Sequence, residues 1–181
     1  MRPPLVKRAD AQRNRATILA TAEEMFAADG VAVSVDDIAK QAKVGIGTLY
    51  RHFPTKDALV AAIVIARTSV MADHTERALD QKDAGAALFD LIETLAAEGD
   101  KKRDLVESLG STELLMTPEL HETRMRFKKA LGKLVSHAQD QGAVRAGIQA
   151  TDITAMLKAL FGTEPKSRAR LLAIFCDGIR A

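Results

Sequence analysis

The chain contains little of what holds proteins together outside the cell or anchors them in a membrane. Its single cysteine, Cys176, excludes an intrachain disulfide. Its longest apolar run, residues 58–66, is far shorter than the roughly 20 residues that cross a bilayer as a helix. The opening residues 1–4 are not followed by the apolar core of a signal peptide. We therefore expect a soluble, cytoplasmic protein.

Signals for β-structure are also scarce. The 181 residues include 11 glycines and 5 prolines, and no stretch alternates apolar and polar residues for long enough to indicate a sheet. Apolar residues instead recur at helical spacing nearly throughout, and a hydrophobic content of 47% is enough for a substantial core. This pattern predicts an all-α protein of about nine helices, with room for one large or two small domains.

Residues that are typical of catalysis do not cluster. The four histidines, His52, His74, His121 and His137, are scattered along the chain and form no metal-binding motif. Cys176 lies in an apolar helical pattern, which indicates packing rather than a nucleophile, and no glycine-rich phosphate loop occurs. We therefore predict no catalytic residue, no metal site and no cofactor, and an enzyme is only the third interpretation of the chain.

The most informative stretch is residues 34–56, whose pattern predicts two short helices around a tight turn. Ser34, followed three residues later by Asp37, resembles a capping box and marks a helix start. The apolar spacing then breaks, and we expect Gly45 to supply the backbone angles of a sharp corner. A second helix ends before Pro54, which disfavours helical geometry at the preceding residue. Helix, short turn and helix form the outline of a helix-turn-helix.

The second of these helices has an apolar side and an outer side. Val44, Leu49 and Phe53 can face a core. The outer face is then predicted to carry Ile46, Gly47, Thr48, Tyr50, Arg51 and His52. Residues 40–56 contain three lysines, one arginine and no acid, which suits the phosphates of DNA. Glycine at position 47 lowers helix stability by about 1 kcal/mol relative to alanine. A binding partner that must approach the helix backbone closely would explain why a residue without a side chain is present there.

Two segments of this region, FAADGVAVSVDDIAKQAKV and GIGTLYRHFPTKDAL, resemble those of a known family. They are similar to the helix-turn-helix and the following helix start of TetR-family transcriptional repressors, over residues 10–65. The resemblance implies that Thr48, His52 and Lys56 contact phosphates, and the position of Tyr50 gives its hydroxyl the same role. Ile46 and Arg51 read base edges or merely flank the helix. The full set of predicted DNA-binding residues is Ser34, Val35, Gly45, Ile46, Gly47, Thr48, Tyr50, Arg51, His52 and Lys56.

The first helix is predicted from about residue 10 to Asp29, where Gly30 ends it. Its buried stripe consists of Ile18, Ala22, Met25 and Phe26. Residues 1–9 look disordered. The first twenty residues contain one acid, Asp10, and five cations, namely Arg2, Lys7, Arg8, Arg13 and Arg15. These cations predict either a solvated tail or a basic arm that contacts the DNA backbone or minor groove.

Beyond residue 65 the interpretation rests on pattern alone. Helices are predicted at 56–79, 88–99, 100–110 and 117–141, followed by one that Thr151 caps and one after Pro165. The helix over 56–79 begins in the DNA-binding region and leaves it, so it is the natural mechanical link. We accordingly predict an N-terminal DNA-binding domain over residues 1–55 and a C-terminal regulatory domain over residues 56–181.

The last two predicted helices can pair with those of a second copy as a four-helix bundle, as TetR-family proteins do, or simply close the core. The predicted dimer residues are Ile153, Met156, Leu157, Leu160, Leu171, Leu172, Phe175 and Ile179. A small molecule, partly apolar, could lie between the helices of the second domain. Its predicted lining is Phe89, Met116, Met125, Phe127, Met156 and Phe161, with His121 and Arg124 as polar contacts, although ordinary core packing is the better explanation for any one of them.

Two functions of different classes fit the sequence. The first is a homodimeric, ligand-responsive repressor that binds a palindromic double-stranded DNA operator through its recognition helices. The second is a helical protein-interaction module whose helix-turn-helix is structural. The resemblance favours the first, although it does not distinguish repression from activation.

Overall fold

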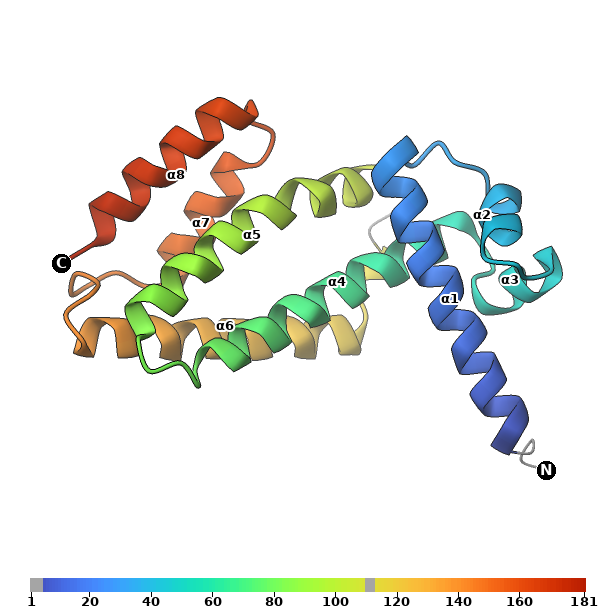
Figure 1. The fold of residues 1–181 in the computed structure, drawn as a ribbon, viewed down its shortest axis with the longest axis horizontal. Helices are drawn as coiled ribbons and strands as arrows, with labels where there is room; N and C mark the ends of the chain where they lie inside the picture. The colour runs from blue at the N-terminus through green and yellow to red at the C-terminus, as the bar shows by residue number, and fades with distance from the viewer. Residues whose placement is uncertain (1–4, 110–112) are drawn as a thin grey trace. The chain divides into compact units, whose positions relative to one another are not determined.

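The computed structural model describes residues 5–109 and 113–181, and most of these residues are helical (Figure 1). Within these ranges the only β-pairing is an isolated bridge between Val144 and Arg180. The helices are α1 (Leu5–Asp29), α2 (Val35–Gln41), α3 (Ile46–His52), α4 (Lys56–Ala78), α5 (Ala84–Glu107), the 3₁₀-helix η1 (Glu113–Leu115), α6 (Pro118–Asp140), α7 (Ala150–Leu160) and α8 (Pro165–Ile179). The predicted all-α fold is confirmed.

The chain divides into two compact units. The first consists of residues 1–65 and 105–115, and the second consists of residues 66–104 and 116–181. The helices α4 and α5 therefore each contribute one part to the first unit and one part to the second. The predicted division of function at residue 55 is a separate matter and stays a prediction.

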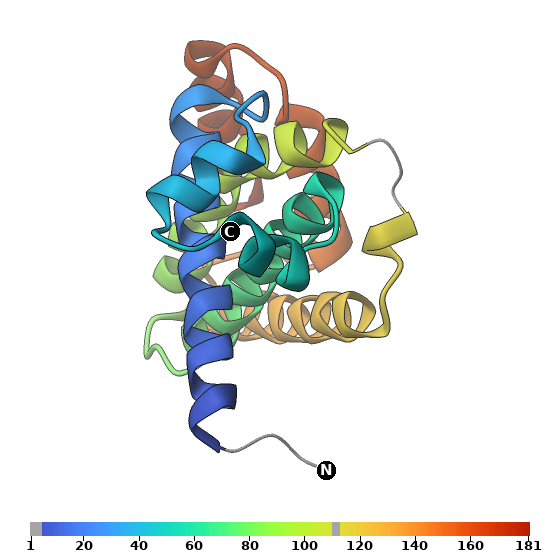
Figure 2. The same cartoon turned by 90° about the vertical axis from the view of Figure 1, so that its right-hand side faces the viewer.

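In the first unit, α1 contacts both α2 and α3, and α2 contacts α3 (Figure 2). The apolar side chains that these helices bury are Ile18, Ala22 and Phe26 from α1, Ile38 and Ala39 from α2, and Leu49 from α3, with Phe53 just beyond it. The first part of α4 adds Leu59, Ile63 and Val64. The predicted stripe of α1 is confirmed for Ile18, Ala22 and Phe26, while Met25 is only partly buried.

The first helix begins earlier than the sequence indicated. α1 starts at Leu5, so residues 5–9 are helical rather than disordered. The buried side chains of α1 that the structure describes, Ile18, Ala22 and Phe26, lie in its later part, and the apolar pattern therefore marked that part of the helix. The prediction for residues 1–4, which include Arg2, lies outside the described residues.

In the second unit, α5, α6, α7 and α8 share one core. Its buried members include Leu88, Leu91 and Ile92 from α5, Leu131, Leu134 and Val135 from α6, Ile153 and Leu157 from α7, and Cys176 and Ile179 from α8. Burial raises the pKa of the Cys176 thiol, which agrees with a packing role for this residue.

The starts of α4 and α6 are confirmed in detail. The Thr55 hydroxyl accepts a hydrogen bond from the Ala58 amide at 3.0 Å, and the Thr117 hydroxyl accepts one from the Leu120 amide at 3.1 Å. Each hydroxyl satisfies an amide that has no partner within its helix. The start of α7 differs from the prediction, because Gln149 rather than Thr151 is its cap, through a reciprocal pair of hydrogen bonds with Asp152.

The predicted break between a helix at 88–99 and another at 100–110 is wrong. α5 runs without interruption from Ala84 to Glu107. Gly99 does not end a helix, and its role is to make room for a side chain from another part of the same unit. A Cβ atom at Gly99 would lie 1.8 Å from Cε1 of Phe161, so only glycine allows the ring to pack there.

One described helix, α4, is long and apolar enough to cross a membrane by length and composition alone. The uninterrupted apolar run in this helix, residues 58–66, is much shorter than the helix itself and did not indicate a candidate of this length. The large side chains of its first part, such as Leu59, Ile63 and Val64, are buried among the helices of the first unit. This part of α4 is therefore packed as a core helix of the first unit.

Candidate nucleic-acid interface

The start of α2 is built by a reciprocal pair of hydrogen bonds. The Asp37 amide donates to the Ser34 hydroxyl at 3.1 Å, and that hydroxyl donates to the Asp37 carboxylate at 2.7 Å. The capping-box-like start is confirmed. Asp36 and Asp37 suit the positive end of the helix, but their charge is unfavourable to a phosphate, so contacts at Ser34 and Val35 would have to use backbone amides that remain open.

The corner between α2 and α3 differs from the prediction in its key residue. Lys43, rather than Gly45, adopts the left-handed conformation, with φ at 55°. The amides of Lys43 and Val44 donate to the carbonyls of Lys40 and Ala39 at 3.1 and 3.0 Å, the pattern of a Schellman C-cap. This position usually favours glycine, so the sequence pattern pointed to the wrong residue.

Gly45 is the N-cap of α3 and has ordinary extended angles, φ −67° and ψ 142°. Its carbonyl accepts hydrogen bonds from the amides of Thr48 and Leu49 at 2.8 and 3.2 Å. Because glycine has no side chain, no cap group covers the first turn of α3. The helix ends at His52, and its C-cap, Phe53, has an extended backbone before Pro54 as predicted.

The side chains of α3 divide sharply between core and surface. Leu49 and Phe53 are 0% and 2% exposed, whereas Ile46 and Tyr50 are 39% and 44% exposed. Gly47 and Arg51 are also exposed, and Thr48 and His52 are partly buried. A Cβ atom at Gly47 would meet nothing within 4 Å, so no packing within the chain explains this glycine. The outer face predicted for this helix is therefore present.

The basic side chains near the outer face of α3 differ in what they contact. Arg51 and Lys43 are exposed, whereas Lys40 lies 3.7 Å from Asp37 in a surface ion pair. The ammonium of Lys56 lies over the Phe26 ring at 5.9 Å, which places this predicted phosphate contact at the edge of the unit's core.

The predicted basic arm is only partly described. Arg13 lies in α1, 4.0 Å from Asp10, and the guanidinium of Arg15 lies over the Phe53 ring at 5.3 Å. Arg15 therefore packs against the helix-turn-helix and does not belong to a free tail. The side chains of Lys7 and Arg8 lie outside the described residues.

The residues predicted to line a ligand site fall into two groups. Four of them pack against the core of the second unit, namely Phe89, Phe127, Met156 and Phe161. The other four are exposed, namely Met116, His121, Arg124 and Met125. The Phe89 ring also carries the guanidinium of Arg180 at 4.5 Å. The structure therefore gathers half of the predicted set around one core and leaves the other half on the surface.

The residues predicted to form a dimer interface also divide. Four are at most 6% exposed and belong to the chain's own core, namely Ile153, Leu157, Leu160 and Ile179. They fill the core of their own unit and present almost no surface to a partner. Met156, Leu172 and Phe175 are partly buried, and Leu171 is 44% exposed.

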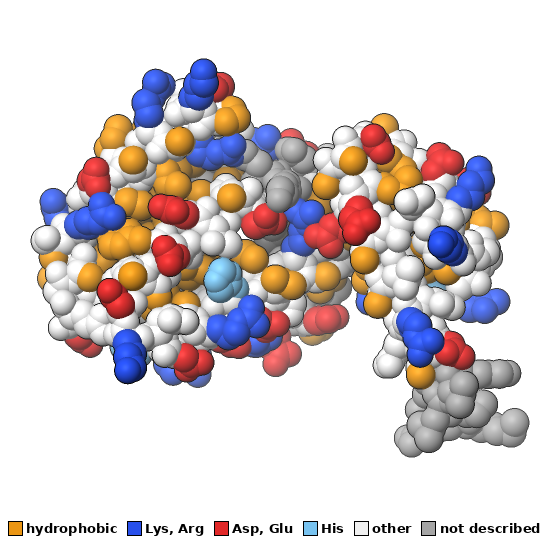
Figure 3. Space-filling model, viewed as in Figure 1, with side chains coloured by type: hydrophobic (Ala, Val, Ile, Leu, Met, Phe, Trp, Pro, Cys, Tyr) orange, Lys and Arg blue, Asp and Glu red, His pale blue; other side chains and the backbone are white. Residues whose placement is uncertain are grey.

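The sequence analysis missed the most exposed apolar residue of α8. Ile174 is 67% exposed, and it lies one turn after Leu171 on the same side of the helix. Apolar side chains reach the surface of this region between scattered charged groups (Figure 3). The signal was available in the spacing, since Leu171, Ile174 and Gly178 recur at i, i+3 and i+7.

Among the residues for which the structure gives side chains, no group of three histidine, cysteine, aspartate or glutamate residues is arranged to hold a metal ion.

Comparison with known families agrees with this architecture. The model for "Bacterial regulatory proteins, tetR family" matches residues 18–63, which include α2 and α3. The model for "Transcriptional regulator SbtR-like, C-terminal domain" matches residues 83–181, more than half of the chain. The chain belongs to the TetR family of transcriptional regulators.

Solved TetR-family structures match along nearly the whole chain. A TetR transcription regulatory protein from Mycobacterium vanbaalenii is 36% identical, and the match covers 98% of this chain and 100% of that one with a TM-score of 0.75. The TetR regulator SCO0520 from Streptomyces coelicolor is 29% identical, with 92% and 98% covered and a TM-score of 0.73.

Curated relatives match over a shorter region. The HTH-type transcriptional repressor Rv3405c of Mycobacterium tuberculosis is 41% identical over 76 residues, which cover 36% of this chain and 40% of that protein. The chain therefore matches less than half the length of such relatives.

Proposed function

We propose that this TetR-family regulator is a homodimeric repressor that binds a palindromic DNA operator through α3 and leaves it when a small-molecule effector binds. The observation that supports this most is the division of side chains on α3. Leu49 and Phe53 hold the helix against the core, while Ile46, Tyr50 and Arg51 are exposed at its outer face. A protein with this role acts in the cytoplasm, where bacterial DNA is accessible.

Each residue of the outer face has a distinct proposed role. The hydroxyls of Tyr50 and Thr48 donate to phosphate oxygens, and the Arg51 fork suits the O6 and N7 acceptors of guanine. Ile46 offers an apolar contact to a thymine methyl. His52 and Lys56 add phosphate contacts at the far end of the helix, and Gly45 leaves the first turn of α3 open.

We propose that the dimer forms through the outer faces of α7 and α8, centred on Leu171 and Ile174. In this proposal the core residues Ile153, Leu157, Leu160 and Ile179 do not contact the partner, and they hold α7 and α8 in place within their own subunit. The two recognition helices would then lie about one helical turn of DNA apart, roughly 34–36 Å. In this scheme residues 1–55 bind DNA, and residues 56–181 dimerise and bind the effector.

The effector site is proposed for the second unit. Phe89, Phe127, Met156 and Phe161 form its apolar part, and Met116, His121, Arg124 and Met125 are surface residues that would contact a ligand only near an entrance. Structures that share this fold at about a fifth identity include a γ-butyrolactone receptor, 22% identical, and FadR of Bacillus subtilis in complex with stearoyl-CoA, 19% identical. By analogy with these proteins of the same fold, we propose that the effector of this chain is partly apolar.

Replacing Tyr50 tests the recognition face. Tyr50→Ala and Thr48→Ala should each lower the affinity for a duplex selected from a random pool by at least about tenfold, because a hydrogen bond to a charged group contributes about 1.5–3 kcal/mol. Tyr50→Phe separates the hydroxyl from the ring, and Thr94→Ala, a partly buried threonine on α5, is the matched control. Fluorescence anisotropy measures the affinity, and circular dichroism checks the fold. Unchanged binding by both α3 variants would show that this face does not contact DNA and would favour the protein-interaction module.

Gly47 tests whether DNA approaches the α3 backbone closely. Gly47→Ala should raise the free energy of unfolding by up to about 1 kcal/mol, because the position is helical and a methyl group there meets nothing. It should at the same time weaken operator binding. Gly132→Ala is the matched control, since it is helical and equally open but lies on α6. Urea unfolding and anisotropy measure the two effects. A more stable Gly47→Ala protein that binds as tightly as the wild type would contradict the close approach.

Charge introduced on α8 tests the dimer surface. Leu171→Glu and Ile174→Glu should each weaken the dimer at least about tenfold, because both would bury a carboxylate against an apolar partner. Val70→Glu, at an α4 position that is 55% exposed, is the control. Sedimentation equilibrium gives the dissociation constant. Dimers that tolerate both α8 substitutions would place the interface elsewhere.

A further inference from the structure

The two parts of α4 are held by different kinds of side chain. Within the first unit, the helix buries large aliphatic residues, namely Leu59, Val60, Ile63 and Val64, together with Ala61. Within the second unit, residues 66–78 bury only small ones, namely Thr68, Ala72, Thr75 and Ala78. The helix is therefore fixed in the first unit by bulky packing that it lacks in the second.

Small side chains give a helix little to fix its position along its neighbours. Alanine and threonine offer no long knob to fill a particular hole, and the Thr75 hydroxyl is turned back to the Met71 carbonyl of its own helix at 2.8 Å. Packed helices with such faces can slide by small shear motions. Directional contacts then help to give residues 66–78 one position. One of them joins the Arg67 guanidinium of α4 to the Glu98 carboxylate of α5 at 3.7 Å.

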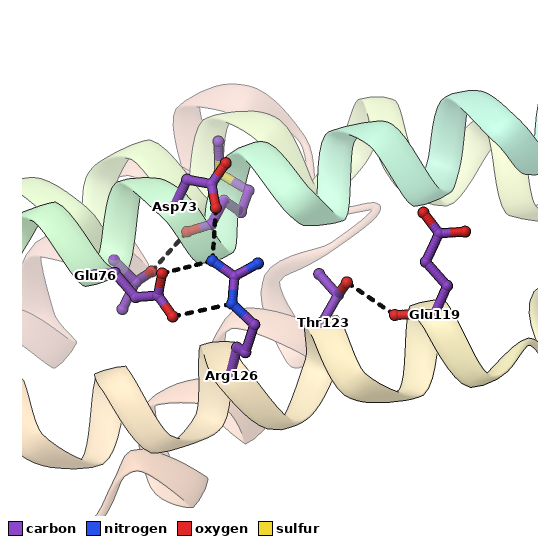
Figure 4. Close-up of polar contacts among 7 residues, drawn as sticks. Asp73, Glu76, Glu119, Thr123 and Arg126 are labelled. Carbon is purple, nitrogen blue, oxygen red and sulfur yellow. Dashed lines mark hydrogen bonds and ion pairs between the residues drawn. The ribbon is translucent and has the colours of Figure 1, made fainter.

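Arg126 of α6 provides such a contact (Figure 4). Its Nε donates to Glu76 Oε1 at 3.1 Å, and its Nη2 donates to Glu76 Oε2 at 2.5 Å and to Asp73 Oδ1 at 2.7 Å. Asp73 and Glu76 both belong to α4, and the Arg126 side chain extends from α6 toward them. A bidentate contact of this kind fixes the orientation of the guanidinium relative to the carboxylate as well as the distance between them.

Arg126 and Glu76 stabilise each other's charged forms. The hydrogen bond from Arg126 lowers the pKa of Glu76, and the two carboxylates raise the pKa of Arg126. Because the pKa of Glu76 is lowered on folding, its contribution is present above the usual pKa and is lost only as pH falls through the lowered value. Without the arginine, two like charges one turn apart on α4 would repel each other.

We infer that Arg126 is a positioning residue that clamps the second part of α4 to α6 and so sets the register of the helix leading to the DNA-binding residues. Its effect on DNA binding rests on the proposed function. The side chains of Arg126, Asp73 and Glu76 are 40%, 46% and 42% exposed, so removing the clamp does not leave a buried charge. The fold should therefore survive the substitution, and the position of α4 should change.

Arg126→Met tests the clamp, because methionine keeps much of the length and removes the charge and the donors. Lys129→Met, at an exposed position of the same helix, is the matched control. Hydrogen exchange followed by mass spectrometry should show amides of residues 66–78 exchanging at least about threefold faster in Arg126→Met and in Glu76→Gln, and at the wild-type rate in the control. Wild-type exchange in both clamp variants would overturn the inference.

Operator affinity tests whether the clamp reaches the DNA-binding residues. Arg126→Met and Glu76→Gln should each change affinity at least about fivefold, and the double variant should change it no more than Arg126→Met alone, because Arg126→Met already removes the contact with Glu76. A lower affinity would mean that the clamped register binds DNA, and a higher one that it disfavours binding. Unchanged affinity with faster exchange would overturn the link to DNA. Wild-type protein that binds no selected duplex would instead refute the proposed function, and the exchange result would still decide the clamp.

Discussion

The burial of Leu49 and Phe53 is the constraint on which the rest of the first unit depends. With both side chains essentially inaccessible to solvent, α3 has one possible rotation against α1 and α2. That rotation leaves Ile46 and Tyr50, which are four residues apart and share a side of the helix, exposed together with Arg51. The outer face is thus a consequence of core packing, and any recognition chemistry of this helix is set by two buried residues that never contact a ligand.

Much of this arrangement could be predicted, because it is local. Hydroxyl caps, a proline after a helix and apolar spacing act within a few residues, and Thr55, Thr117 and Pro54 behave as their chemistry requires. Glycine was an uneven signal, because Gly30 and Gly142 adopt left-handed angles just after α1 and α6 as predicted, whereas Gly45 and Gly99 do not have their predicted roles. Gly99 leaves space for the ring of Phe161, which lies 62 positions later in the sequence. Lys43 adopts the left-handed conformation although it is not a glycine. Neither fact is visible in a short window of sequence.

The second unit was harder to interpret for a related reason. Apolar spacing marks a helix face but does not say whether that face is covered by the chain itself or by a partner. Ile153 and Ile179 proved to be core, whereas Ile174 is exposed on the same pair of helices. The Arg126 clamp joins side chains 50 and 53 positions apart, and a charge pattern within one helix cannot predict such a partner. Long-range pairing, rather than helix formation, limited the prediction.

The central claim is that the outer face of α3 lies against duplex DNA. A titration of ¹⁵N-labelled protein with a selected duplex, followed by NMR, tests it most directly. The account predicts that the largest amide shifts fall on residues 45–52, with smaller ones near Lys56. Shifts concentrated instead on the exposed lysines of α6, Lys128, Lys129 and Lys133, with α3 unchanged, would contradict it.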